Sequence, residues 1–85
     1  MTAATTLETG LAELVAQASE GAVTAAEALA EPRSLGLLGL TSLGFLRLIN
    51  AVERSYGVAL DLDDDVSYLD TIASLAAHLR ERGVS

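Results

Sequence analysis

The chain has 85 residues, no cysteine, one histidine and a formal net charge of −7 at pH 7. A domain of this size buries only about 60–65% of its unfolded surface, so we expect one modest core and no deep catalytic cleft. The absence of cysteine excludes disulfides, thiolate catalysis and zinc–thiolate sites, and the negative charge argues against nucleic acid as a partner.

Hydrophobic residues make up 51% of the sequence but aromatic residues only 4%, so the core must be aliphatic, which favours helices. No apolar run reaches the roughly 18–20 residues that span a membrane, and the start "MTAATTLETG" lacks the basic and hydrophobic regions of a signal peptide. We therefore expect one cytoplasmic domain over residues 1–85, monomeric and not membrane-bound. The initial Met1 and the lack of flanking linkers favour a free-standing protein, although a domain cut from a larger synthase would have the same features.

The first predicted helix begins at Thr5 and ends near Gly21. Thr5 and Glu8 have the spacing of a capping box, in which each side chain accepts a hydrogen bond from the other residue's amide. Apolar residues then recur at spacings of three and four, which is typical of an amphipathic helix. These residues are Leu7, Leu11, Leu14, Val15 and Ala18.

A second capping-box spacing occurs at Thr24 and Glu27, but Pro32 restricts the residue before it and ends any helix within about two turns. The pattern predicts a short helical turn inside a long loop. Residues 32–41 contain one proline, two glycines and four leucines. We expect this loop to be ordered, with its leucines buried against the core.

Residues 42–56 form the clearest predicted helix, which Gly57 ends. At 100° per residue its apolar face carries Phe45, Leu46, Leu48, Ile49, Val52 and Tyr56. The opposite face carries Gly44, Arg47, Asn50, Ala51 and Arg54. Leu43 falls on the polar side, so we expect an exposed leucine directly beside Ser42.

Residues 61–69 are compatible with a short helix, since the acidic run "DLDDD" complements a helix N-terminus. The last helix begins near Asp70 or Thr71, and it turns Ile72, Leu75, Ala76 and Leu79 inward. No segment alternates convincingly at period two. The predicted fold is all-α: a small four-helix bundle of three main helices plus a short third helix.

Residues 38–58, "LGLTSLGFLRLINAVERSYGV", followed by an acidic turn and "LDTIASLAAHL", resemble the acyl and peptidyl carrier proteins. That family typically has Leu-Gly-x-Asp-Ser-Leu at the start of its second helix, then a Leu-x-x-x-Leu-Glu-like run and an aromatic-Gly-aliphatic turn. The matching residues here are Leu38, Gly39, Ser42 and Leu43, then Leu48, Val52 and Glu53, then Tyr56, Gly57 and Val58. The resemblance covers essentially the whole chain.

The resemblance implies that Ser42 is the attachment point of 4′-phosphopantetheine, transferred from coenzyme A by a phosphopantetheinyl transferase. The physical setting agrees, because the amides and dipole at a helix N-terminus favour a neighbouring phosphate. The arm brings the thiol that holds the cargo, so a cysteine-free chain can carry thioesters. Thr41 stands where the family usually has aspartate. Threonine can still cap the helix, but a charge that helps the transferase to dock is missing.

The resemblance also implies a partner surface and a cargo pocket. We expect partners to contact Leu43, Gly44, Arg47, Asn50 and Arg54. The partners implied are the transferase, a loading enzyme of adenylation or acyltransferase type, and downstream synthase or tailoring enzymes. Phe45 points to the space that holds long acyl chains in the family, so we expect a small cavity and a short or polar cargo. Alternatively, Phe45 packs against the core and leaves room beside it.

The acidic run is the strongest competing site. Asp61, Asp63 and Asp65 imitate the first ligands of a calcium loop, but that loop needs glycine at Val66 and glutamate at Ile72. We interpret the run as a solvated turn or a docking element and expect no metal site.

No set of catalytic residues emerges from the sequence. His78 lies on the last helix without a nucleophile or carboxylate anchored to it, and Tyr56 and Tyr68 fit edges of the core. A hydrolase using Ser42 lacks a base. The chain is thus interpreted as a discrete, non-enzymatic carrier in polyketide, nonribosomal peptide or related secondary metabolism. The alternative is an unmodified helical interaction or scaffold domain with the same fold, which only Thr41 supports.

Overall fold

A computed structural model describes residues 5–60 and 65–84. Over these residues every regular element is helical, which confirms the all-α prediction. In chain order the elements are α1 (Thr6–Ala18), α2 (Ala25–Ala30), the 3₁₀ turn η1 (Leu35–Leu38), α3 (Ser42–Tyr56), the 3₁₀ turn η2 (Ser67–Leu69) and α4 (Ile72–Glu81). The short helix expected over residues 61–69 is represented in its described part by η2 alone.

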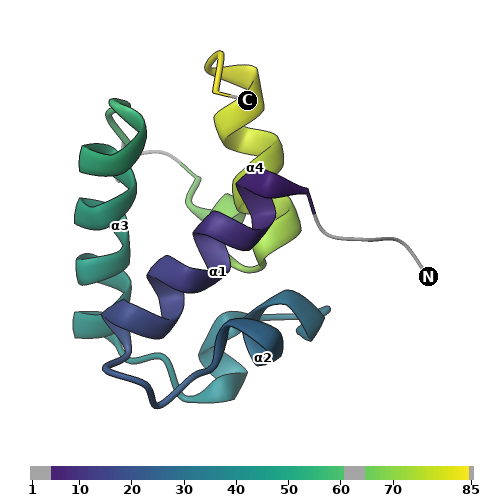
Figure 1. Cartoon of the computed structure of the whole chain (residues 1–85), viewed down its shortest axis with the longest axis vertical. Helices are drawn as coiled ribbons and strands as arrows, with labels where there is room; N and C mark the ends of the chain where they lie inside the picture. Colours follow the sequence, from purple (N-terminus) through teal and green to yellow (C-terminus); the bar gives the residue numbers. More distant parts are fainter. Residues whose placement is uncertain (1–4, 61–64, 85) are drawn as a thin grey trace.

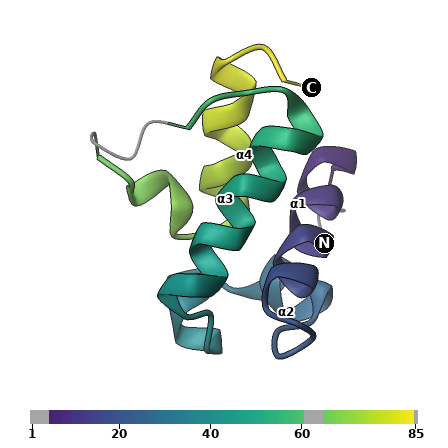
Figure 2. The same cartoon turned by 90° about the vertical axis from the view of Figure 1, so that its left-hand side faces the viewer.

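Helix α1 holds the molecule together, since it packs against α2, α3 and α4. It crosses in front of α3 and α4, while α2 lies across the bottom of the bundle (Figure 1). Viewed from the side of α3, the turn η2 projects from the edge of the bundle opposite α1 (Figure 2). None of the helices in the described ranges is both long and apolar enough to cross a membrane.

The core is aliphatic, as the composition predicts. Every buried side chain among the described residues is apolar, and the aromatic side chains of Phe45, Tyr56 and Tyr68 pack only at its edge. The largest fully buried side chains are Leu11, Leu35, Leu48, Ile72, Leu75 and Leu79. They come from η1 and three helices, so burial of aliphatic surface fixes all of these elements together.

Side chains cap the helices where the sequence predicts. The capping boxes at Thr5 and Thr24 are both formed, and Gly57 ends α3 in the left-handed conformation with φ of +67°. Of the two predicted starts for α4, Thr71 is the residue that caps it, in a third capping box with Ser74. These boundaries follow from local chemistry that the sequence exposes.

The loop before α3 departs in part from its prediction. Leu35 and Leu40 are buried and Leu38 is partly buried, but Leu37 is 62% exposed. The turn η1 explains the difference, because a 3₁₀ helix has three residues per turn. Successive side chains therefore point in three directions, and only one of these directions faces the core. The amide of Leu35 donates a 2.7 Å hydrogen bond to the carbonyl of Asp70 and ties η1 to the segment before α4.

Helix α3 is rotated relative to the predicted face. Gly44, expected on the outer face, is buried, and Leu46, expected on the apolar face, is 51% exposed. Both residues lie at borders of the apolar stripe, and α1 packs on the border that carries Gly44 and Ala51. A Cβ on Gly44 would lie 2.6 Å from Cδ1 of Leu40, so only glycine leaves room for that leucine.

Candidate functional site

Ser42 is the first residue of α3 and its side chain is exposed. The preceding residue, Thr41, caps the helix: its Oγ1 accepts a 3.1 Å hydrogen bond from the amide of Gly44. Within the described ranges the Ser42 hydroxyl makes no hydrogen bond. Thr41 therefore takes the structural role at this helix start, and the Ser42 oxygen is available for chemistry.

The surroundings of Ser42 suit a phosphate. The first turn of α3 contains no acidic residue, and the amides of Ser42 and Leu43 donate to no acceptor among the described residues. Unpaired amides and the positive end of the helix dipole both favour an anion at this position. The residues present thus fit a phosphodiester linked to the Ser42 oxygen.

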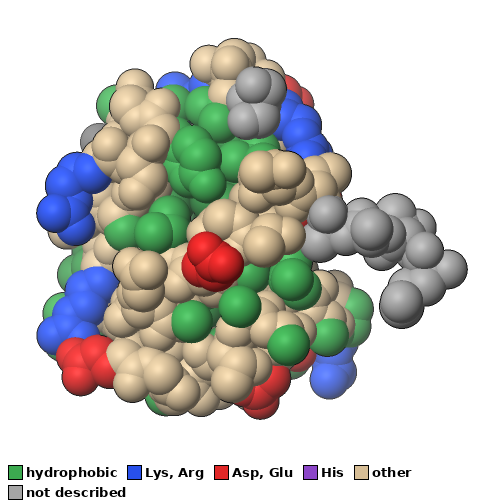
Figure 3. Space-filling view, viewed as in Figure 1, with side chains coloured by type: hydrophobic (Ala, Val, Ile, Leu, Met, Phe, Trp, Pro, Cys, Tyr) green, Lys and Arg blue, Asp and Glu red, His purple; other side chains and the backbone are tan. Residues whose placement is uncertain are grey.

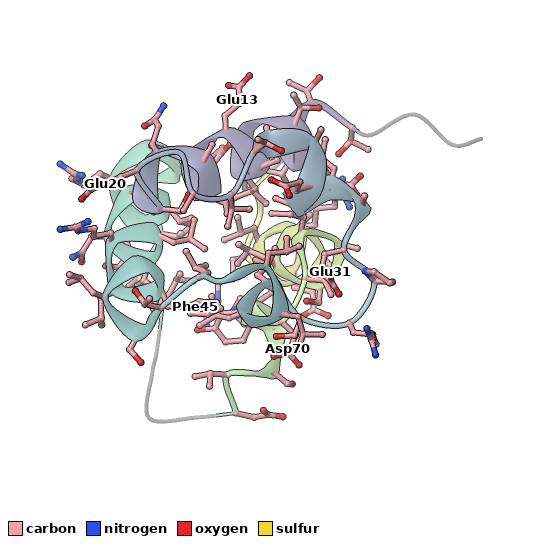
Figure 4. The ribbon with its side chains drawn as sticks, turned by 90° about the horizontal axis from the view of Figure 1, so that it is seen from below. Glu13, Glu20, Glu31, Phe45 and Asp70 are labelled. Carbon is pink, nitrogen blue, oxygen red and sulfur yellow. The ribbon has the colours of Figure 1, made fainter. Side chains whose placement is uncertain are left out.

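An open hollow of about 420 Å³ lies beside Ser42. It is lined by Ser42, Phe45, Leu46, Val66, Leu69 and Asp70. In the view from below, Phe45 extends from α3 toward the segment that carries Asp70 (Figure 4). One wall of the hollow is on α3, and the other is formed by residues of η2 and its flanks. The hydrogen bond from Leu35 to Asp70 ties this second wall to η1.

The expectation of a small cargo cavity at Phe45 stays a prediction, because this hollow is open at the surface. The phenyl ring is half-buried and packs against the edge of the core, so it forms one wall of the hollow and does not fill it. Rotation of α3 contributes, because it turns Leu46 out of the core and into the rim of this space. This arrangement is compatible with the alternative in which Phe45 packs on the core and leaves room beside it, and the size of the cargo stays a prediction.

The predicted partner surface is exposed except at one residue. Leu43 is 56% exposed, and Arg47, Asn50 and Arg54 are also exposed on the outer side of α3, whereas Gly44 lies buried beneath them. Arg47 forms an ion pair with Glu20, with 2.5 Å between Nη1 and Oε1. The surface therefore combines an apolar end beside Ser42 with two arginines farther along the helix.

Residues 10–79, which are most of the chain, match the family described as the phosphopantetheine attachment site. The chain belongs to this family. Its cofactor is 4′-phosphopantetheine, held covalently, and its general role is that of a phosphopantetheine carrier. No curated protein and no solved structure matches the chain.

Family membership gives the coarse function of this carrier domain. Carrier domains interact with phosphopantetheinyl transferases and with synthase enzymes, and they are generally not catalytic themselves. The match names neither the modified residue nor the pathway.

The competing sites gain no support in the carrier domain. Asp61 and Asp63 lie outside the described residues, and Asp65 Oδ1 accepts a 3.0 Å hydrogen bond from the amide of Ser67. In the described ranges no three His, Asp or Glu side chains are grouped so that they could hold a metal ion.

His78 has a structural setting that the sequence did not reveal. Its ring stacks on Tyr68, with centroids 3.8 Å apart and planes 7° from parallel. Its Nε2 accepts a 3.2 Å hydrogen bond from Nε of Arg82. The stacking joins η2 to α4, and the bond from Arg82 holds the ring at the end of α4.

Two further features of the carrier domain were also not predicted. Glu20 contacts Arg47 although 27 residues separate them in the chain. Gly10, which breaks the α1 pattern, leaves room for Tyr56: a Cβ there would lie 2.6 Å from the tyrosine hydroxyl oxygen. A glycine inside a strongly periodic helix was the available signal for a close contact of this kind.

Proposed function

We propose that Ser42 is the residue that carries the phosphopantetheine arm, and that the loaded arm takes an acyl or aminoacyl thioester from enzyme to enzyme. The observation that carries this proposal is the exposed Ser42 hydroxyl, which bonds to none of the described residues, at an α3 N-terminus capped by Thr41. We place the carrier in polyketide, nonribosomal peptide or related secondary metabolism.

The experiment is intact-mass measurement after incubation with coenzyme A and a broad-specificity phosphopantetheinyl transferase. The unaltered chain is expected to gain one phosphopantetheine. Ser42→Ala is expected to gain none, and Ser55→Ala, which changes another exposed serine of α3, is expected to behave as the unaltered chain. Attachment that persists in Ser42→Ala, mapped by peptide analysis to another serine, would contradict the assignment.

The second candidate function is an unmodified interaction domain, and Thr41 is the observation that favours it. If no transferase in a panel modifies the chain, Thr41→Asp separates poor docking of the transferase from a true interaction domain that is never modified. Because aspartate caps a helix as well as threonine does and supplies the charge usual in the family, it should restore modification if docking alone is deficient. An unmodified Thr41→Asp variant would favour the interaction domain.

We propose that partner enzymes contact the outer side of α3 through Leu43, Arg47, Asn50 and Arg54. Gly44 contributes indirectly, because it lets α3 pack closely against Leu40. Two arginines and few carboxylates on this surface disfavour enzymes that read an acidic helix. We therefore expect dedicated partners. The expectation would be contradicted if a fatty acid malonyl transferase loaded this chain as fast as it loads its own carrier.

The hollow beside Ser42 bears on the cargo. We propose that an apolar group of the cargo rests against Phe45, Leu46 and Leu69. Amide chemical shifts of the form loaded with an octanoyl-length chain test this against the form loaded with a small acyl group. Changes along α3 and η2 with the longer chain alone support the proposal, and identical changes limited to residues next to Ser42 refute it.

A further inference from the structure

The outer side of α3 is positively charged, although the chain as a whole is strongly acidic. Arg47 and Arg54 are seven residues apart, so they lie on one side of the helix, about 10 Å apart along its axis. The one carboxylate of α3, Glu53, accepts a 2.9 Å hydrogen bond from the amide of Leu60 and is turned toward that loop. Basic side chains accordingly line the edge of the molecule over α3 (Figure 3).

A groove of about 230 Å³ runs between α1 and α3 and joins the two arginines. It is lined by Leu14, Gln17, Ala18, Arg47, Ala51 and Arg54, and no carboxylate lines it. Arg54 makes no ion pair with any residue in the described ranges. Small alanine side chains on both helices leave the groove open. The exposed guanidinium of Arg54 lies at one end, and that of Arg47, paired with Glu20, lies at the other.

Glu20 sits at the Arg47 end of this surface in an unusual backbone conformation. Its φ of +55° makes it the only non-glycine residue with positive φ in the described part of the chain. The Ser19 hydroxyl holds the surrounding loop, since it accepts a 3.0 Å hydrogen bond from the amide of Val23. From this loop the carboxylate reaches Arg47, and the view from below shows Glu20 beside α3 (Figure 4).

We propose that the α1–α3 groove binds an acidic helical segment of a partner enzyme, and that Glu20 occupies the position of one of the partner's carboxylates on Arg47. Charge complementarity carries this choice of occupant, because two arginines face outward from a groove without carboxylates. Both members of the internal pair are exposed, at 47% for Arg47 and 73% for Glu20, so an incoming carboxylate can displace Glu20. That the partner is an enzyme rests on the proposed carrier function.

If Glu20 competes with a partner carboxylate for Arg47, two substitutions that each remove one charge should have opposite effects on partner binding. Arg54→Gln removes an arginine that meets the partner, so binding should weaken. Glu20→Gln removes the internal competitor and leaves Arg47 open, so binding should become tighter. If Glu20 instead served only to hold its loop against α3, its replacement would leave binding unchanged or weaken it.

The test uses the unmodified chain, labelled with ¹⁵N, and a synthetic helical peptide with two glutamates seven residues apart on an alanine-rich face. At low salt we expect amide shifts at Gln17, Ala51 and Arg54 that disappear at high salt. Arg54→Gln should weaken binding about fivefold or more and Glu20→Gln should tighten it severalfold. Arg33→Gln, an exposed arginine outside the groove, is the matched control.

Any of four results would overturn the proposal: no binding of the acidic peptide, equal binding of its lysine counterpart, shifts outside the groove, or no tightening in Glu20→Gln. Concentration-dependent dimers that Arg54→Gln abolishes would instead assign the groove to a second copy of the chain. Because the experiment does not involve the arm, its failure leaves the assignment of Ser42 standing, and failure of the modification assay leaves this result standing.

Discussion

Four α-helices begin within residues 5–60 and 65–84, and one of them begins differently from the others. Each of the helices α1, α2 and α4 starts with a reciprocal capping box, in which the residue at the third helical position bonds back to the cap. At α3 the cap is one-sided: Thr41 accepts from the amide of Gly44, and glycine has no side chain to return a bond. The four pairs are Thr5–Glu8, Thr24–Glu27, Thr71–Ser74 and Thr41–Gly44.

The difference shows how the first amides of α3 can stay unpaired while the helix start remains stable. A glutamate at the position of Gly44 would place a negative charge at the end of α3 where we propose that the phosphate is attached, and the two would repel each other. Glycine avoids that charge, and it also lets Leu40 fold under the first turn of α3. Packing of Leu40 thus replaces the missing half of the capping box.

Gly44→Ala should break this arrangement most strongly. Alanine favours helix by about 1 kcal/mol over glycine, but its Cβ would lie 2.6 Å from Cδ1 of buried Leu40. Overpacking costs more than the propensity gains, so we expect a net loss of about 1–2 kcal/mol in the free energy of unfolding, measured with urea. Gly36→Ala, whose Cβ meets Ser34 Oγ only at 3.4 Å, is the control. A more stable Gly44→Ala variant would contradict the role given to Leu40.

The next effect concerns the cap itself. Thr41→Ala should lower the free energy of unfolding by about 1 kcal/mol, because the amide of Gly44 loses its acceptor. Ser42→Ala should change it by less than about 0.5 kcal/mol, since the Ser42 hydroxyl makes no bond in the described structure. Urea unfolding of the two variants measures the contrast. Equal losses in both would show that Ser42 shares in the capping of α3.

Local chemistry explains how much of this fold is predictable from sequence. The caps at Thr5, Thr24 and Thr71 depend on residues three apart, and they located the starts of their helices within one or two residues. The end of α1, expected near Gly21, lies at Ala18. The assignment of Ser42, which stays a prediction, also rests on a local motif. All of these signals lie within one or two helical turns of the chain.

The features that were wrong or missing depend on contacts between distant segments. Rotation of α3, which exposes Leu46 and buries Gly44, is set by the side on which α1 packs. The hollow beside Phe45 needs η2 in place, and the pair of Glu20 with Arg47 spans 27 residues. A helical projection of one segment contains none of this information, because it treats every border of the apolar stripe alike.

The smallest expected effect is on the pH dependence of stability. It separates α1 and α2, whose first turns carry Glu8 and Glu27, from α3, whose first turn carries no acidic residue. Hydrogen bonds from Thr5 hold the pKa of Glu8 below its ordinary value of 4.5, and those from Thr24 do the same for Glu27. A depressed folded pKa contributes stability that is complete above about pH 4.5 and is lost as the pH falls through the folded value.

Glu8→Gln and Glu27→Gln should therefore flatten the dependence of unfolding free energy on pH between about pH 5 and pH 3, each by a small amount because both carboxylates are largely solvated. Urea unfolding at several pH values measures the slope. Glu13→Gln, an exposed residue of α1 with no capping bond, is the control. Because α3 has no carboxylate in its first turn, Thr41→Ala should lower stability by the same amount at every pH in this range. A Thr41→Ala effect that disappears at acid pH would show that a carboxylate does act on the start of α3 and would remove the contrast between the four helix starts.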